Sequence, residues 1–281
     1  MKKIFSVFCS FLFLSFSAAG AHELASHEAV YDISLASTKG GAVGVVDARG
    51  KMGYRIRKVC DQWETESVFS LDVGYEMAGP DTTNWKQTTK ESADGCLFEF
   101  DVFVREKGAD RKDLSGKAVC EGNKKVLRLE LPVRSEAIFP KNVVFPVQQT
   151  LRLLHAAKAG KKSVSAYVYD GTRPDALYSM NAMISFPEKT DTPKISGDVS
   201  LVSDKKAYRY DTAFFEEFSG DGQPDGEPRY EVSMHYYENG ISDQIEQDFG
   251  AYRLKSTLKK IKKLKDIPCP TKKKRQSLTT R

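Results

Sequence analysis

Apolar and polar residues alternate along most of this chain, and no other feature of the sequence limits its fold so strongly. Tyr31, Ile33 and Leu35, for example, alternate with Asp32 and Ser34. Successive side chains of a strand point to opposite faces, so this spacing predicts strands that bury one face and expose the other. The pattern returns at residues 68–73, 98–104, 126–131, 164–169, 177–186, 208–218, 230–237 and 250–258. The chain is therefore predicted to be mainly β.

Short turn sequences separate these segments. Asp94-Gly95, Asp170-Gly171 and Asn239-Gly240 each follow or precede an alternating run, and Asn-Gly in particular favours a two-residue hairpin. The sequence contains no long Pro/Gly/Ser linker and no internal repeat. These observations predict a single domain over residues 22–270, built as an antiparallel meander. A sheet of a dozen or more strands in one domain must curl or close.

One segment departs from the alternation and predicts the main helix. Over residues 146–159, Val147, Leu151 and Leu154 recur at helical spacing, a proline begins the segment, and Gly160 follows it as a stop. An apolar stripe on a helix must pack against another element. We expect it to cover the concave face of the curled sheet.

The first 21 residues indicate export. Lys2 and Lys3 precede an apolar run over residues 4–16, and small residues lead up to Ala21, which is typical of a signal peptide cleaved after that residue. The run is shorter than the roughly 20 apolar residues that span a bilayer. Cys9 lies inside the run, so it cannot be the acylated first residue of a mature lipoprotein. These features predict a soluble periplasmic protein.

Export changes the interpretation of the cysteines. The mature chain keeps Cys60, Cys96, Cys120 and Cys269, and four thiols in an oxidising compartment favour two disulfides. Three pairings are possible, and the spacing does not rank them. The sequence contains no CxxC motif and no Cys/His cluster with metal-ligand spacing. We therefore expect neither a metal nor a redox cofactor.

Positive charge is concentrated near the C-terminus. From Arg253 onward, 12 basic residues accompany one acidic residue, Asp266, and residues 271–281 are predicted to be a disordered basic tail. Such a tail solubilises the protein, or else makes a weak contact with an anionic surface. Nucleic acid is not an expected partner of an exported protein.

The sequence offers no catalytic motif. It lacks the nucleophile elbow, the zinc-protease motif, the phosphate-binding loop and the dinucleotide fingerprint. Asp170, Asp248 and His235 are the candidates for a hydrolase site, but no spacing links them. The acidic loop at 221–227 departs from a calcium-binding loop, because it contains Pro224 and lacks the final glutamate. We expect a protein that is not an enzyme.

Taken in order and spacing, several short segments resemble a known family. They are residues 27–36, 48–52, 60–63, 94–100, 139–146, 153–160, 170–172, 230–233, 237–241, 248–250 and 268–270. Together they are similar to the EipB family, also called the DUF1849 domain, of alphaproteobacterial cell-envelope proteins. The likeness covers most of the mature chain.

The resemblance implies a fold and a function. It implies a long antiparallel sheet curled into an open, spiral-like barrel, similar to the LolA and LolB lipoprotein carriers. It implies a disulfide between Cys60 and Cys269, which leaves Cys96 and Cys120 to pair with each other. In such an open sheet we expect the first and last strands to carry the exposed edges, with the first disulfide holding them. The implied role is support of cell-envelope integrity through contacts with periplasmic proteins, TPR-containing ones among them.

Three classes of function follow. The first is a non-enzymatic periplasmic protein that supports the outer membrane through protein contacts. The second is a lipid or lipoprotein carrier, which needs an apolar cavity between sheet and helix. We expect inward side chains to line such a cavity, although the same side chains would equally form a filled core: Phe98, Phe100, Leu154, Met180 and Phe186. The third, less favoured, is a hydrolase acting on envelope glycan or lipid.

Overall fold

The computed structural model describes residues 24–39, 44–106, 112–186, 194–217 and 226–270. The predicted signal peptide, the acidic loop up to residue 225 and the predicted basic tail lie outside these ranges. In the described part of the chain, no helix has the length and apolar character needed to cross a bilayer. The elements are β1 (His27–Thr38), β2 (Val45–Val59), β3 (Gln62–Tyr75), β4 (Asp81–Ser92), β5 (Leu97–Glu106), β6 (Lys112–Glu121), β7 (Lys124–Leu131), β8 (Ser135–Pro140), α1 (Pro146–Lys158), β9 (Ser163–Tyr169), β10 (Leu177–Ser185), β11 (Ser196–Gly197), the 3-10 turn η1 (Val199–Leu201), β12 (Ala207–Glu216), β13 (Tyr230–Tyr237), β14 (Ser242–Asp248) and β15 (Tyr252–Lys263).

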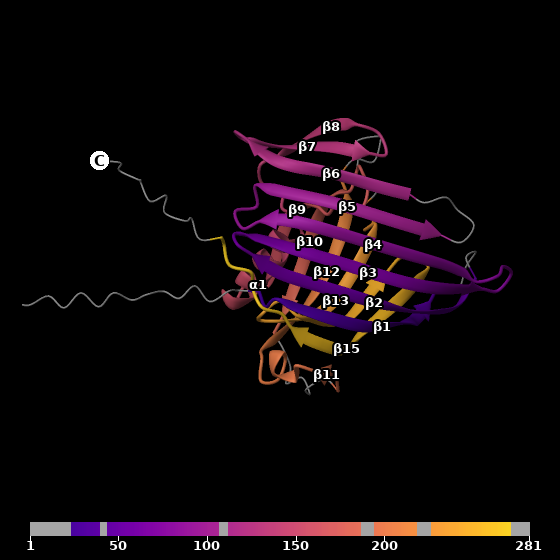
Figure 1. Cartoon of the computed structure of the whole chain (residues 1–281). Coiled ribbons are helices and arrows are strands. Elements are labelled where there is room, and N and C mark those ends of the chain that lie inside the picture. The colour runs from indigo at the N-terminus through magenta and orange to yellow at the C-terminus, as the bar shows by residue number, and fades with distance from the viewer. Residues whose placement is uncertain (1–23, 40–43, 107–111, 187–193, 218–225, 271–281) are drawn as a thin grey trace, which may run out of the picture.

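The strands form one long sheet, as the alternation predicts. Its order is β8-β7-β6-β5-β4-β3-β2-β1-β15-β14-β13-β12-β10-β9, with every neighbouring pair antiparallel, and the short β11 lies beside β15. Figure 1 shows how this sheet curls: β1 to β8 form one layer, and β10, β12 and β13 pass behind it. Phe98, Phe100 and Val102 of β5 are buried at alternate positions, as expected for a strand with one covered face.

The expected position of the sheet edges is wrong. The first and last strands pair with each other, with Ala29 opposite Ile261 and Tyr31 opposite Leu258, so both of these strands lie in the middle of the sheet. The edges are instead β8 and β9, which precede and follow α1. Just after β8, Val144 donates its N–H to the Tyr167 carbonyl at 2.8 Å and accepts from the Tyr169 N–H at 3.0 Å. This one bridge joins the two edges of an otherwise open sheet.

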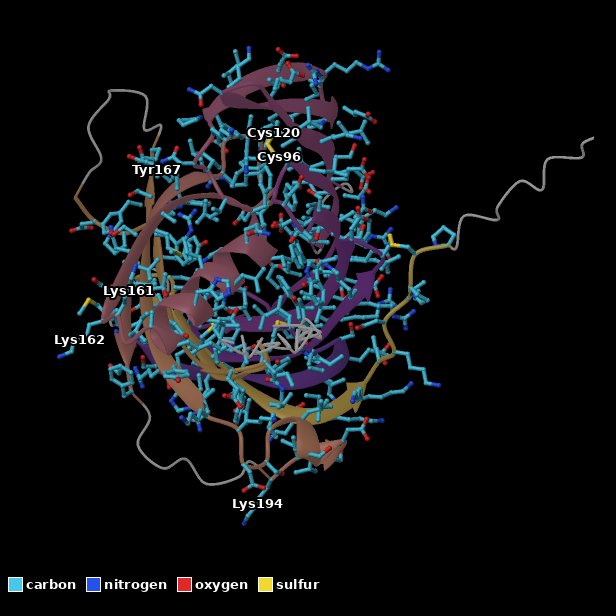
Figure 2. The ribbon with its side chains drawn as sticks, turned by 90° about the vertical axis from the view of Figure 1, so that its left-hand side faces the viewer. Cys96, Cys120, Lys161, Lys162, Tyr167 and Lys194 are labelled. Carbon is cyan, nitrogen blue, oxygen red and sulfur yellow. A yellow bond between two sulfur atoms is a disulfide. The ribbon has the colours of Figure 1, made fainter. Side chains whose placement is uncertain are left out.

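The predicted helix is present and lies inside the curl. It ends at Lys158, one residue before the predicted limit, and Gly160 follows with a positive φ of 72°. The Gly160 N–H donates to the Ala157 carbonyl and the Lys161 N–H to the Ala156 carbonyl, a pattern that closes helix ends. Figure 2 shows α1 lying between the two layers of the sheet. The helix therefore fills part of the interior, as its apolar side predicts.

The buried side of α1 differs in one position from the predicted stripe. Val147 and Leu154 are buried, as predicted. Leu151, the third residue of the predicted stripe, is only half-buried, whereas the neighbouring Leu153 is buried. Leu154 packs in a cluster with Leu24, Ile56, Trp63 and Val147. The larger core cluster fills the space between β5 to β10, β12 and the other side of the helix.

Two disulfides are present in the structure, with the pairing that the family resemblance implies. Cys60 is bonded to Cys269, 209 residues apart, and Cys96 to Cys120, 24 residues apart; Figure 2 labels the second pair. Next to the first bond, the Cys60 N–H donates to the Ile267 carbonyl at 2.7 Å. The bond therefore fastens the C-terminal segment along the end of β2.

Candidate binding cavity

A cavity of about 350 Å³ lies inside the curl, partly open to solvent. Its walls come from the inward faces of β1 to β4 on one side and of β12 to β14 on the other. The first half of α1 and the segment just before β1 complete it. The volume lies at the lower end of the range typical of small-molecule sites. We therefore treat this cavity as the candidate functional site.

The expected lining residues do not form this cavity. Phe98, Phe100, Leu154 and Met180 are at most 2% exposed and belong to the packed clusters, whereas Phe186 is 52% exposed after the end of β10. The long aromatic side chains of β5 fill the space on their side of α1. The open space lies on the other side, between β1 to β4 and β12 to β14.

The lining combines apolar groups with neutral polar ones. Its apolar part includes Met52, Phe214, Val232, Met234 and Ile245, contributed by β2 and by β12 to β14. Methionine is unbranched and flexible, so it adapts its shape to what it contacts.

The polar part of the lining carries hydroxyl and amide groups. Within the described chain, none of the lining residues is Asp, Glu, Lys or Arg. His27 is the one titratable base among them, and its burial lowers its pKa, so it stays neutral at neutral pH. The cavity therefore presents no charged side chain.

Thr212 has an unsatisfied hydroxyl group in this cavity. The residue lies on the inward face of β12, is 4% exposed, and lines the cavity. Among the described residues, none forms a hydrogen bond with its Oγ1. A buried hydroxyl without a partner costs free energy, so native structures rarely keep one without a reason. In its present rotamer the Oγ1 atom is closed off from the cavity, so a molecule there would meet the hydroxyl only after rotation about the Cα–Cβ bond of Thr212.

A pair of threonines adds a second donor. The hydroxyl oxygens of Thr65 on β3 and Thr89 on β4 lie 2.7 Å apart, and both residues line the cavity. Each hydroxyl has one hydrogen, and one of the two hydrogens forms the shared bond. The other hydrogen remains free to donate to a molecule in the cavity.

A buried carboxylate holds α1 against this cavity. Glu91 of β4 is fully buried and accepts the Val147 N–H at 2.8 Å and the Gln148 N–H at 2.9 Å. The first backbone N–H groups of a helix have no partner inside the helix, and its N-terminus favours negative charge. Burial nevertheless raises the pKa of Glu91 to about 7, against the two N–H donors and Lys125, which lower it.

Lys125 of β7 supports the same helix start. Its Nζ donates to the carbonyls of Gly95 at 2.8 Å and Val143 at 2.7 Å, and lies 4.2 Å from the centre of the Phe145 ring. These contacts fix the chain immediately before Pro146. Together, Glu91 and Lys125 determine where the helix enters the interior.

The three hydrolase candidates do not form a site. Asp170 Oδ1 accepts the N–H and the hydroxyl of Thr172 within the β9–β10 turn, and burial raises its pKa. Asp248 accepts from Arg253 and from the Gly250 N–H at the β14–β15 turn. His235 lies on β13, where it is opposite Asp243. The strand register therefore separates the three residues, and each of the two aspartates has a local structural role.

Sequence reasoning missed the residues that line the cavity. Gln87 and Thr89 line it from β4, and Glu91 points inward from the same strand; the polarity of these residues hides the alternation that identifies a strand. Thr212 lies in a correctly predicted strand, between the inward residues Tyr210 and Phe214. A polar residue at an inward position of a strand is a sequence signal that points to the cavity.

Comparison with known proteins agrees with the fold. A family model described as EipB-like matches residues 18–265. The cell envelope integrity protein EipB of Brucella abortus (strain 2308) is 27% identical over 254 residues, which cover 87% of this chain and 86% of that protein. The crystal structure of a β-barrel-like protein of domain of unknown function DUF1849 from Brucella abortus has a TM-score of 0.77 and 23% sequence identity, covering 87% of this chain and 100% of that one. Because the family model spans most of the residues, the chain belongs to the EipB-like family.

Proposed function

We propose that this chain is a periplasmic protein that supports the integrity of the cell envelope, without catalysis and through contacts with other envelope proteins. The observation that carries the proposal is the relative that matches 87% of the chain and is named a cell envelope integrity protein. The N-terminal sequence, typical of a cleaved signal, supports export to the periplasm. The family resemblance adds a TPR-containing protein as a partner.

The edge strand β8 is where we propose that a protein partner docks. In the described part of the chain β8 pairs only with β7, so one side of its backbone is unpaired. Ile138 is 58% exposed on β8, and Val133 is 71% exposed just before it. Unpaired backbone groups at a sheet edge bind an extended segment of another chain by adding a strand. The occupant we propose is an extended, apolar segment of a periplasmic protein.

A matched pair of variants tests this role. Ile138→Lys places a charge on the edge and should abolish cross-linking to partner proteins in the periplasm. It should also fail to restore detergent resistance in a strain that lacks the gene. Met77→Lys, at a position that is 97% exposed in the β3–β4 loop, should behave as the unaltered protein. Full complementation by Ile138→Lys would exclude β8 as the contact surface.

The cavity favours a second candidate function, the binding of a lipid or of the acylated end of a lipoprotein. The specific observation is the buried Thr212 hydroxyl, which has no protein partner and lines an uncharged cavity. Native mass spectrometry of protein purified from the periplasm tests it. A retained lipid mass supports a carrier, and a lipid-free protein that copurifies with another protein supports the contact role alone. An anionic-surface contact of residues 271–281 remains a separate proposal.

A further inference from the structure

The cavity's chemistry restricts the class of molecule that it can hold, provided that the proposed lipid or lipoprotein binding is correct. An ionised head group loses its hydration when it enters a protein interior, and it needs an opposite charge or several hydrogen bonds in return. Within the described residues the lining supplies no Asp, Glu, Lys or Arg, and its only histidine is held neutral. A carboxylate, phosphate or ammonium group would therefore enter at a large cost.

The polar groups that remain can satisfy a hydrogen-bond acceptor on the ligand. The Thr212 hydroxyl has no partner, and the Thr65 and Thr89 pair keeps one hydrogen free. Both sites can therefore donate a hydrogen bond. The carbonyl oxygen of an ester or amide accepts such bonds and has no charge.

The apolar groups favour a flexible chain. Val232 and Met234 point inward from β13, with Phe214 on the neighbouring β12 and Met52 on the opposite wall. Methionine side chains repack around chains of different shape, so the walls can close on a chain without a fixed outline. A cavity of about 350 Å³ suits one chain of medium length better than a whole two-chain lipid.

We propose that the cavity binds a single acyl chain attached through an uncharged ester or amide, and that the Thr212 hydroxyl turns about the Cα–Cβ bond and donates a hydrogen bond to the carbonyl of that linkage. An ester would come from a glycerolipid, and an amide from an acylated protein. Thr212 is a binding residue in this proposal, and the lack of a charged partner in the described lining selects neutral linkages over free fatty acids.

Three ligands with the same chain test the charge preference. 1-Lauroylglycerol carries an ester, N-lauroylglycinamide an amide, and laurate an ionised carboxylate. In calorimetric titrations of the mature protein at pH 8, laurate should bind at least ten times more weakly than the better of the two neutral ligands. Ester-only binding identifies the glycerolipid source, and amide-only binding the acylated-protein source.

Variants of Thr212 test the hydrogen bond. Thr212→Val keeps the shape but removes the hydroxyl, so neutral ligands should bind about three to ten times more weakly. The ligand-free variant should melt at a higher temperature, because it no longer buries an unsatisfied group. Thr212→Ser should retain binding. Thr88→Val, on the outer face of β4, serves as the control and should change neither quantity.

The outcomes separate this inference from the carrier function on which it rests. If laurate binds as tightly as the neutral ligands, or if Thr212→Val weakens all three equally, the charge and hydrogen-bond argument is wrong while the carrier function survives. If none of the three binds and periplasmic protein carries no lipid, both fail. A rise in melting temperature together with weaker binding of neutral ligands supports the inference, since a purely structural Thr212 would not weaken binding.

Discussion

At the scale of single residues, Glu91 links the sheet to the helix and is the residue whose protonation matters most. It is fully buried, and its carboxylate accepts both N–H groups at the start of α1. Electrostatic interaction with Lys125 on β7 lowers the pKa of Glu91, and Glu91 in turn raises the pKa of Tyr54 on β2. The carboxylate therefore anchors the helix, although its burial disfavours the charged form.

The pKa of Glu91 predicts a pH dependence of stability. The folded-state pKa, about 7, lies above the ordinary value of 4.5. The contribution of the protonated carboxyl is fully present below about pH 4.5 and is lost as pH rises through about 7, by up to about 3 kcal/mol. The Glu91→Gln variant has no carboxyl group to titrate at this position, so this contribution is absent from it. The free energy of unfolding of the unaltered protein minus that of the variant should therefore fall between pH 4.5 and 7.

Urea denaturation of both proteins across this pH range measures the difference. His27 and His235 have lowered pKa values and titrate in both proteins, so their contribution cancels in the subtraction. A difference that stays constant from pH 4 to 8 would show that Glu91 does not titrate in the folded protein.

At the scale of elements, α1 occupies the interior and its packing separates core from cavity. Leu154 is 1% exposed and packs with Leu24, Ile56 and Trp63. Leu154→Ala should lower the free energy of unfolding by about 2–5 kcal/mol, because it removes buried methyl groups and leaves a void. Arg152→Ala, on the exposed side of the same helix, should cost much less. Chemical denaturation compares the two, and equal losses would contradict the packing described here.

Among the strands, β4 shows how inward polar side chains hide a structural signal. Its inward positions hold Gln87, Thr89 and Glu91, which bond to the chain or line the cavity. A strand with polar residues on both faces lacks the alternation that predicts strands. The prediction therefore misses β4, although β4 contributes to the cavity and anchors the helix.

At the scale of the whole molecule, the disulfides act on a sheet in which the first and last strands of the chain pair in the middle. In the chain-entropy model, the bond from Cys60 to Cys269 stabilises the fold by about 5 kcal/mol and the bond from Cys96 to Cys120 by about 3 kcal/mol. The first bond also keeps the segment after β15 paired along β2, where Ile267 donates to the Lys58 carbonyl at 2.9 Å. Replacing both Cys60 and Cys269 by Ser should therefore lower the melting temperature more than replacing Cys96 and Cys120.

Thermal unfolding of the two double variants under non-oxidising and oxidising conditions checks this order. Non-reducing peptide mapping of the unaltered protein checks the connectivity itself. A peptide that links Cys60 to Cys96 or to Cys120 would contradict it, and equal melting temperatures of the two variants would contradict the energetic argument.

The sequence by itself determined the local structure of this protein. Alternation at Tyr31 to Leu35 or at Phe98 to Val102 depends on which face of a strand meets water, and helix α1 depends on residue spacing and on Gly160. Both are properties of neighbours along the chain, so they can be predicted from a short window. The number of predicted strands already required the sheet to curl or close. The family resemblance added that it curls into an open, spiral-like barrel, because the resemblance rests on the order of segments along the whole chain.

Only the tertiary structure decided where the edges and the cavity lie. Pairing of β1 with β15 joins residues more than 200 positions apart, and it moves the edges to β8 and β9. Thr212 and Thr65 face one cavity only because β12 and β3 lie on opposite walls of the curl. Whether an inward side chain packs tightly or leaves a cavity depends on which side chains face it from the opposite layer of the sheet. That opposing surface comes from distant parts of the chain, so no local pattern in the sequence specifies it.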